Sequence, residues 1–358
     1  MMKNFIRKYA KAAGLAIVAA AGAATTMFSA CNSLVYDYEG DCNVTYRLKF
    51  RYDLNLKWAD AFANEVKSLR CYVFDNSGKL IREYDEQGQQ LADPDFAIEL
   101  DLPAGNYHFM AWCGIDNPGA QPQFDVPQAT TGVTIPDDLT CRLNRRATQA
   151  YPALSDQRLE FMFHGQLDAV LPEPKQGGDY TYIMPLTKDT NHLRIILQHL
   201  SGQDLDVEQF QFKIEDSNGF YDHKNNLLDD EIITYEPYST SSGQAGVIIG
   251  DNSRAVVDVK TAIADFSFGR MAIEHKRDMI LTIINRNGKT IARIPVIDYA
   301  LLAKDYYEEA YGHKMTDQEF LDREDEYIMT FFIDENHDWY SAYIYILSWR
   351  IVLHNYDV

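Results

Sequence analysis

Cys31 is the residue whose type and position most clearly permit chemistry. It follows Phe28-Ser29-Ala30, and a thiol directly after two small residues can take a thioether-linked diacylglycerol before the preceding peptide is cut. The chain up to Lys11 carries four cations and no acid, and residues 12–27 are mostly small or apolar. This layout is typical of a secretory signal. We therefore predict that residues 1–30 are a signal peptide and that Cys31 is the lipidation site.

The tetrapeptide ending at Cys31 resembles a bacterial lipobox, from which it departs at Phe28, where Leu is commonest. The alternative is an uncleaved membrane helix, because residues 12–30 are nearly long enough to span a bilayer. Their Ala, Gly and Thr content makes them a weak span, which favours cleavage. Two acyl chains on Cys31 would suffice for stable anchoring, since each buried methylene contributes about 0.8 kcal/mol. Residues 31–43 would then form a short acidic tether.

The rest of the sequence has no stretch with the spacing of a catalytic or metal site, and the common nucleophile, zinc, phosphate-loop and dinucleotide motifs are missing. His192 and His199 lie seven apart on a predicted strand, so they face opposite sides and cannot share a metal ion locally. Asp216-Ser217-Asn218-Gly219 lacks the spaced ligands of a calcium loop and is predicted to be a turn. One predicted helix carries four acids, which are typical of a solvated face: Glu319, Asp322, Glu324 and Asp325. We predict no enzyme, no catalytic residue, no metal and no cofactor beyond the lipid.

The other four cysteines permit disulfides in an exported chain, but their pairing cannot be read from the sequence: Cys42, Cys71, Cys113 and Cys141. Cys71 and Cys113 lie within apolar runs, where a buried free thiol behaves as a small hydrophobe. We favour free thiols at these two positions.

The chain is strongly acidic. Its formal net charge is −20, and because residues 1–30 contribute +4, the remainder carries −24. Such a chain is not expected to bind nucleic acid through its overall charge. Hydrophobic residues make up 46% of the sequence, which is ample for packed cores.

The elements that follow the tether are mostly strands. Residues 44–52 alternate between apolar and polar side chains, with apolar residues at five alternate positions, which predicts a strand with one buried face. The turns at residues 75–78 and 285–288 contain Asn and Gly between apolar runs and predict hairpins. Residues 114–136 are predicted to form a long surface excursion. Short helices are predicted at 58–66, 299–311 and 317–326.

The predicted fold class is therefore all-β, with antiparallel sandwiches and a few short helices. We place an N-terminal β-sandwich domain at residues 44–186 and a C-terminal β-sandwich domain at residues 187–358. A length of about 330 residues after the signal fits two domains.

Several blocks, in order along the chain, resemble the FimB/Mfa2 family, the fimbrial anchor lipoproteins of Bacteroidales. The blocks lie at residues 52–62, 72–79, 102–114, 186–191, 318–327, 338–339 and 344–349, and include Leu102-Pro103-Ala104-Gly105-Asn106-Tyr107. The resemblance implies two tandem transthyretin-like β-sandwiches, a lipid at the mature N-terminus and attachment of a fimbrial shaft to the outer membrane. Gly105 is expected to supply an unusual φ in a tight turn, and Trp112 and Trp349 to be core residues.

Two functions from different classes stay open. The first is a fimbrial anchor subunit whose partner is a shaft subunit, bound at an open sheet edge, and which also limits fimbrial length. The second is a surface adhesin for host protein or glycan. A shaft-binding edge should be apolar and extended, whereas a glycan site should show aromatic rings beside carboxylates. The sequence does not identify the partner-binding residues. Because the strand at 44–52 begins only thirteen residues after Cys31, its removal would separate the domain from its lipid, which favours an anchor over a shaft unit.

Overall fold

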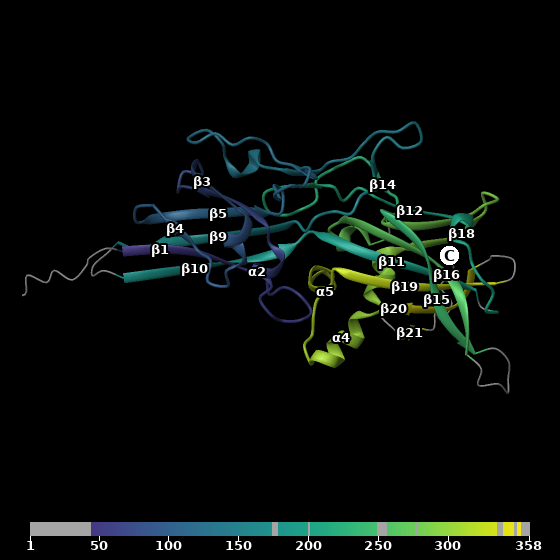
Figure 1. Cartoon of the computed structure of the whole chain (residues 1–358). Coiled ribbons are helices and arrows are strands. Elements are labelled where there is room, and N and C mark those ends of the chain that lie inside the picture. Colours follow the sequence, from purple (N-terminus) through teal and green to yellow (C-terminus); the bar gives the residue numbers. More distant parts are fainter. Residues whose placement is uncertain are drawn as a thin grey trace, which may run out of the picture. The chain divides into compact units, whose positions relative to one another are not determined.

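The strands of the chain form four sheets in the computed structural model (Figure 1). The structure describes residues 44–173, 178–199, 201–248, 256–276, 278–334, 339–346 and 349–351. By internal contacts, residues 46–172 and the described residues from 181 onward belong to one compact unit. The predicted all-β class, with a few short helices, is confirmed.

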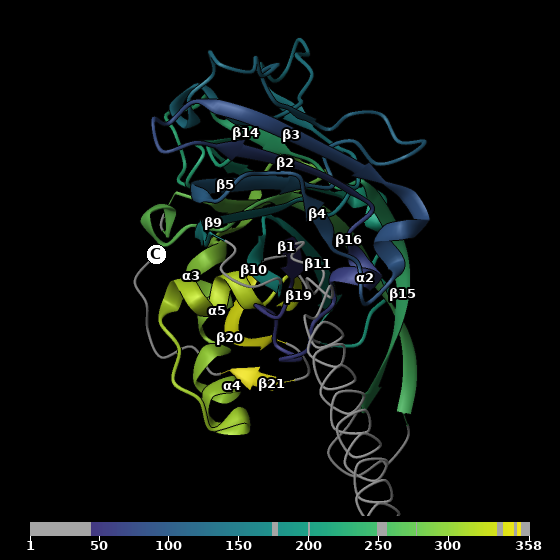
Figure 2. The ribbon, with the colours of Figure 1, turned by 90° about the vertical axis from the view of Figure 1, so that its left-hand side faces the viewer.

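The first sheet has seven strands in the order β3-β2-β5-β9-β10-β1-β4. Figure 2 shows β3, β2, β5 and β9 side by side in this order. The strand predicted at 44–52 is confirmed as β1, whose Tyr46, Leu48 and Phe50 are buried in alternation. The bounds of the strands are β1 Val44–Arg51, β2 Ser68–Phe74, β3 Leu80–Gln87, β4 Ile98–Leu100, β5 Gly105–Cys113, β9 Phe163–Leu171 and β10 Gly178–Lys188.

The first predicted hairpin is confirmed as β2 and β3, which pair antiparallel from Ser68 opposite Gln87 to Phe74 opposite Leu80. Asp75 closes the turn, because its Oδ1 accepts the backbone N–H groups of Ser77 and Lys79. Gly78 has a φ of 75°, which a residue with a β-carbon rarely adopts. The turn residues therefore set the register of this hairpin.

The second sheet has six strands in the order β15-β16-β11-β19-β20-β21. Most of its pairs are antiparallel, but β11 and β19 are parallel, with His192 opposite Glu326 and His199 opposite Ile333. A third sheet has five strands in the order β18-β17-β12-β14-β8, and β14 pairs parallel with β8. Their bounds are β8 Leu154–Ser155, β11 Thr190–His199, β12 Phe210–Asp216, β14 Ile233–Tyr235, β15 Ser239–Ile248, β16 Val256–Gly269, β17 Ile280–Asn285, β18 Thr290–Pro295, β19 Glu326–Ile333, β20 Trp339–Ile346 and β21 Trp349–Ile351.

The six- and five-stranded sheets share one apolar core. Buried side chains of β11 and β16 belong to the same cluster as those of β12 and β17, and the rings of Tyr235 on β14 and Phe268 on β16 lie 6.0 Å apart. The second predicted hairpin is confirmed as β17 and β18, with Gly288 at a φ of 78° in the turn.

The predicted surface excursion at residues 114–136 is only partly one. Within it, β6 (Phe124–Asp125) pairs with β7 (Cys141–Leu143). β7 also pairs with β13 (Phe220–Tyr221), so a small three-stranded sheet is formed by strands from both halves of the sequence. Phe124 is 3% exposed and belongs to the main core. The predicted division at residues 186 and 187 stays a prediction, since β7 and β8 also join strands from the second half.

One local prediction is wrong. Gly105 has no positive φ; instead, a β-carbon there would lie 3.3 Å from the hydroxyl oxygen of Tyr107, whose O–H donates to Pro103 O at 2.9 Å. Glycine is needed at 105 because the Tyr107 ring folds back over the backbone.

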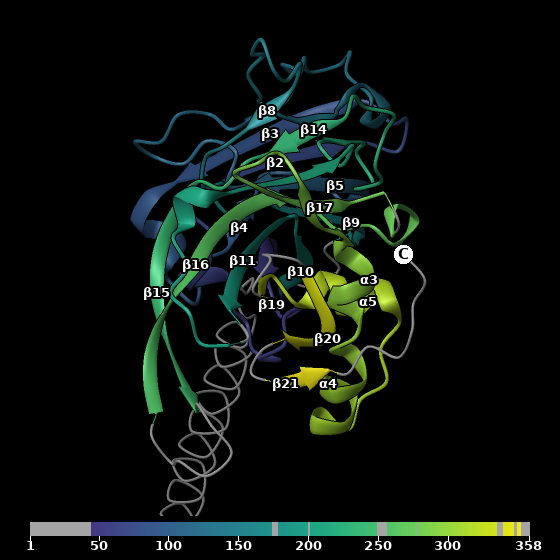
Figure 3. The same ribbon diagram turned by 90° about the vertical axis from the view of Figure 1, so that its right-hand side faces the viewer.

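The helices are shorter than predicted. The segment 58–66 is helical only in α2 (Phe62–Glu65), and the segment 299–311 divides into α3 (Val296–Leu301) and α4 (Lys304–Tyr311), followed by α5 (Asp317–Arg323). Figures 2 and 3 show α3, α4 and α5 grouped beside β20 and β21. Short 3-10 turns complete the elements: η1 Gly88–Ala92, η2 Pro136–Asp138, η3 Val207–Gln209 and η4 Ile273–His275.

The cysteines within the described residues are free and buried: Cys71, Cys113 and Cys141. The free-thiol prediction for Cys71 and Cys113 is confirmed, while Cys42 lies outside the described residues. Trp112 is fully buried, as predicted, and the side chain of Trp349 lies outside what the structure describes.

Candidate functional site

The predicted lipidation site, Cys31, lies outside the described residues, together with the signal peptide at 1–30 and the tether at 31–43. Across the part of the chain that the structure describes, no group of three or more His, Cys, Asp or Glu side chains is placed to hold a metal ion. In that same part, no helix has the length and apolar character needed to cross a membrane. His192 contacts Glu326, with 3.1 Å between Nδ1 and Oε1.

The acids around α5 are not the solvated face that the sequence suggested. Asp322 forms a two-bond ion pair with Arg270, with distances of 2.7 and 2.8 Å, and only 11% of its side chain is exposed. Glu324 is 8% exposed, and Asp325 pairs with Lys188. The prediction failed because the partners of these acids lie far away in the sequence, on β10 and after β16.

Glu324 ends α5 and is held by the backbone that follows it. Its Oε1 accepts the N–H groups of Asp325 at 3.1 Å and Glu326 at 3.0 Å. Burial raises the pKa of Glu324 to about 7, against the opposing effect of these hydrogen bonds. This carboxyl therefore titrates near neutral pH.

Lys188 is a buried cation where β10 ends. Its Nζ lies 2.8 Å from Glu65 Oε2 on α2, pairs also with Asp325 Oδ2, and lies 3.4 Å from the ring centroid of Phe161. A buried ammonium is unfavourable unless charges and hydrogen bonds replace its water. Lys188 therefore ties α2 to the segment after α5 at one point.

Asp189, the next residue, is fully buried. Its Oδ1 accepts a hydrogen bond of 2.7 Å from Asn225 Nδ2 and lies 3.9 Å from Arg270 Nε, while Oδ2 has no hydrogen-bond partner among the described residues. Burial raises the pKa of Asp189 to about 7, although Arg270 and Asn225 favour the ionised form. The passage from β10 to β11 thus carries two buried ionisable side chains in succession.

Arg270 links this passage to the segment predicted as a turn at 216–219. The Arg270 carbonyl accepts from Asn218 Nδ2 at 3.0 Å, and Asn218 Oδ1 accepts from the Tyr235 hydroxyl at 2.7 Å. The segment is irregular rather than a turn, and Asn218 is fully buried. These contacts satisfy polar groups inside the core. We therefore assign the network around Lys188, Asp189 and Arg270 a structural role.

The local sequence carries little signal of this network. Lys188 and Asp189 are flanked by Thr187, Thr190 and Asn191, and a polar passage of this kind is typical of an exposed connection between strands. Arg270 has no local signal either, because its role depends on contacts with residues 189, 225 and 322.

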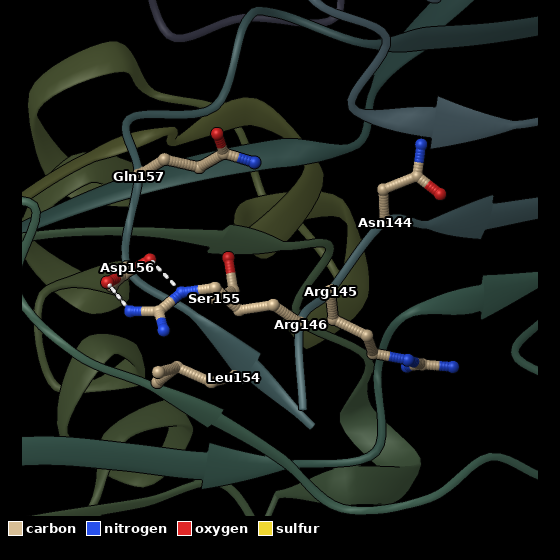
Figure 4. Close-up of a pocket in the computed structure, with 7 residues that line it drawn as sticks. All are labelled: Asn144, Arg145, Arg146, Leu154, Ser155, Asp156 and Gln157. Atoms are coloured by element: carbon tan, nitrogen blue, oxygen red, sulfur yellow. Dashed lines mark hydrogen bonds and ion pairs between the residues drawn. The ribbon is translucent and has the colours of Figure 1, made fainter. Parts of the chain in front are cut away.

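A pocket of about 190 Å³ lies where β8 meets the preceding loop. It is lined by Asn144, Arg145, Arg146, Leu154, Ser155, Asp156 and Gln157 (Figure 4). Arg146 is already paired with Asp156, and Arg145 is paired with Asp230 at 2.6 and 2.7 Å. Because both guanidinium groups are neutralised by these carboxylates, the pocket offers no free cation to an anionic ligand.

An aromatic cluster forms around Trp58, on the loop between β1 and α2. Trp58 is 39% exposed and has a φ of 53°, which is strained for a bulky residue. The buried side-chain amide of Asn55 donates hydrogen bonds to Tyr52 O and Ala59 O, before and after the residue in this loop. The guanidinium of Arg323 lies 3.8 Å and the ring of His313 4.7 Å from the centre of the Trp58 ring, and both contact Glu319. The cluster therefore places an exposed indole beside a carboxylate and an imidazole.

The sheet edges differ in how they are protected. β3 carries four charged residues, β18 carries Arg293 and Pro295, and β4, β8 and β21 are three residues long or shorter. Charges, proline and short length all hinder the addition of a further strand. β15 differs, because its ten residues include no charge and no proline.

Comparison with known proteins places these features in a family. The sequence matches the family model described as fimbrillin-A associated anchor proteins Mfa1 and Mfa2 over residues 38–355. No curated protein matches the chain.

Solved structures agree in fold. A crystal structure of a candidate adhesin from Bacteroides thetaiotaomicron is 30% identical, covers 86% of this chain and 97% of its own, and has a TM-score of 0.74. A second protein of that organism, described as a candidate polysaccharide-binding protein, is 28% identical, covers 87% and 99%, and has a TM-score of 0.71. The fimbrial anchor protein Mfa2 from Porphyromonas gingivalis is 16% identical, covers 87% and 99%, and shares the fold with a TM-score of 0.59. The chain belongs to the Mfa2 family of fimbrillin-associated anchor proteins.

Proposed function

We propose that this chain is a fimbrial anchor subunit, a lipoprotein that attaches a fimbrial shaft to the outer membrane at the cell surface. The observation that carries the proposal is the family match over residues 38–355, which begins seven residues after Cys31. The family is one of structural anchor proteins, and we propose no catalytic activity for this chain.

The anchor itself would be the lipid on Cys31. A single acyl chain gives marginal, reversible membrane binding, whereas a diacylglycerol with two chains holds a protein stably. The tether at 31–43 would then separate the membrane from β1, which begins at Val44. The partner of the chain would be a fimbrial shaft subunit, and the bilayer would be reached through the lipid alone.

The shaft would bind by adding an extended segment to an open sheet edge. Main-chain hydrogen bonds supply affinity in this mode, and alternate side chains supply specificity. One anchor holding the base of a polymer would also limit the length of the fimbria, because a shaft whose base is occupied cannot grow there.

Replacing Cys31 with Ala in the native host tests the proposal. We expect fimbriae to form but to be shed into the medium together with the protein, since the shaft stays bound to an anchor that has no lipid. The matched control is Ser33→Ala, which alters the tether and keeps the thiol. Fimbriae that stay attached to cells after the protein is released would overturn the anchor function.

The N-terminus of the mature protein gives a second test. Protein extracted from membranes should begin at a lipidated Cys31 by mass spectrometry, because cleavage within β1 would separate the domain from its anchor. A dominant product that starts after Arg47, Lys49 or Arg51 would contradict the proposal.

The Trp58 cluster supports a second candidate function, an adhesin that binds glycan. Aromatic rings stack on the apolar faces of sugars, while carboxylates and imidazoles bond to hydroxyl groups, and this cluster supplies all three. Immobilised mucin is a suitable probe. If the chain binds mucin and Trp58→Ala removes that binding while Tyr311→Ala, at another exposed aromatic, does not, the adhesin function is supported. Equal binding by both variants would remove the support.

A further inference from the structure

β15 is the longest strand at an edge of the described sheets and the least protected. It runs from Ser239 to Ile248, at the outer side of the six-stranded sheet. Figure 3 shows β15 as the outermost strand, with β16 on its inner side. Ten residues in extended form span roughly 33 Å. Proteins ordinarily protect an edge of this length with charge, proline, a bulge or a covering element.

The pairing of β15 with β16 is regular throughout. The register runs from Ser239 opposite Asp265 to Ile248 opposite Val256 without a shift, so no bulge interrupts the strand. In an antiparallel pair, alternate residues direct their N–H and C=O groups toward the partner strand and the others direct them away. About five residues of β15 therefore present a donor and an acceptor to the outer side. This row of groups matches the hydrogen-bonding pattern of another extended chain.

The side chains from Ser239 to Gly243 are small, and this leaves a neighbouring apolar residue within reach. Ser241 and Ser242 are exposed and Gly243 is half-buried. A β-carbon at Gly243 would lie 2.5 Å from Cδ1 of Ile263, so this half-buried side chain of β16 extends across β15 where no side chain stands. An apolar residue on an added strand could therefore contact Ile263 over Gly243.

From these observations we propose that the outer edge of β15 binds an extended, uncharged segment of a fimbrial subunit, with an apolar side chain placed over Gly243 against Ile263. The proposal rests on the anchor function above and names the surface that performs it. The edge is extended but not apolar, in contrast to what the sequence suggested, so the main chain supplies most of the affinity. Charge is absent on the strand, so an uncharged segment is the complementary partner.

A second copy of this chain is a poorer occupant. Two chains that each carry −24 after the signal would repel one another.

The test uses the chain from residue 32 onward, with fimbriae sheared from the native host as the probe. The edge variant carries Ser241→Lys with Ser242→Lys, which adds one cation to each face of the edge. We expect it to capture fimbriae at least about tenfold more weakly, a change of about 1.4 kcal/mol, with thermal unfolding unchanged. The matched control carries Gln211→Lys with Thr290→Lys, two exposed positions on β12 and the edge strand β18, and should capture fimbriae like the wild type.

Hydrogen exchange supplies a readout that does not depend on substitutions. On binding fimbriae, amides of β15 should become protected, because the outward N–H groups gain acceptors. If the wild type captures fimbriae and the edge variant captures them equally, with no protection on β15, this inference is wrong while the anchor function stands. If the wild type captures no fimbriae, both fail. If β15 instead mediates self-association that the edge variant abolishes, the occupant is a second copy and the inference is overturned.

Discussion

Replacing Asp189 with Asn should make the chain more stable at neutral and alkaline pH and less sensitive to pH. Burial raises the pKa of this carboxyl from its ordinary value of 3.8 to about 7 in the folded chain. Between these two pH values the folded chain therefore keeps a proton on Asp189 that the unfolded chain has already released. The stability linked to this proton is fully present below about pH 4 and is lost as the pH rises through 7.

The size of the effect follows from the shift. Each pKa unit corresponds to about 1.4 kcal/mol, so a shift of about three units corresponds to about 4 kcal/mol in total. Between pH 5 and pH 8 the wild type should lose about 3 kcal/mol through this one group. The asparagine keeps an acceptor for Asn225 and adds a neutral donor at the position of Oδ2. Arg270 keeps its two-bond pair with Asp322.

Urea unfolding of the chain from residue 32, followed by fluorescence at pH 5 and pH 8, measures the difference. The difference in the free energy of unfolding between the variant and the wild type should grow by about 3 kcal/mol from pH 5 to pH 8, in favour of the variant. The buried carboxyl of Glu324 is present in both proteins and cancels. Asp258→Asn removes the same charge from an exposed strand position and serves as the control. A variant that parallels the wild type at both pH values would refute the reasoning.

Three further outcomes can be measured on the same chain. Lys188→Met should destabilise it by about 3 kcal/mol in urea unfolding, because two acids lose a buried counter-charge; an unchanged midpoint would show that water replaces the cation. Gly114→Ala should cost several kcal/mol, since the new β-carbon would lie within bonding distance of Phe161 O, whereas Gly132→Ala, with a similar φ and open space, should cost only about 1 kcal/mol; equal melting temperatures would contradict this. Burial raises the pKa of the Cys71, Cys113 and Cys141 thiols, so a thiol reagent should label these three only after unfolding. Labelling of any of these three in the native chain would contradict their burial.

Local patterns predicted the elements whose causes are local. The alternation from Val44 to Arg51 predicted β1 because one face of that strand is buried, and the glycines at 78 and 288 predicted hairpins because the turns need positive φ. The acids of α5 were misjudged because a helical charge pattern does not reveal a cation brought up from another strand.

The candidate site was less predictable than the fold. The open edge of β15 depends on where the strand lies in the sheet, and strand order is not written in local periodicity. The strain at Trp58 likewise depends on contacts with Arg323, which lies 265 residues later. The lipidation of Cys31 stays a prediction, and it rests on the local pattern of residues 1–31 alone.

The parallel pairing of β11 with β19 has a consequence for how the chain reaches its native state. His192 and Glu326 are 134 residues apart, and β8 meets β14 across 80 residues, so many contacts have a high sequence separation. Such a topology folds slowly, because the entropy of closing long loops is lost before the pairing is gained. β11, inside the six-stranded sheet, therefore cannot complete its pairing before the last third of the polypeptide, which contains β19, is available. For a protein exported as we propose, this delay would keep the early segments unfolded while they cross the inner membrane.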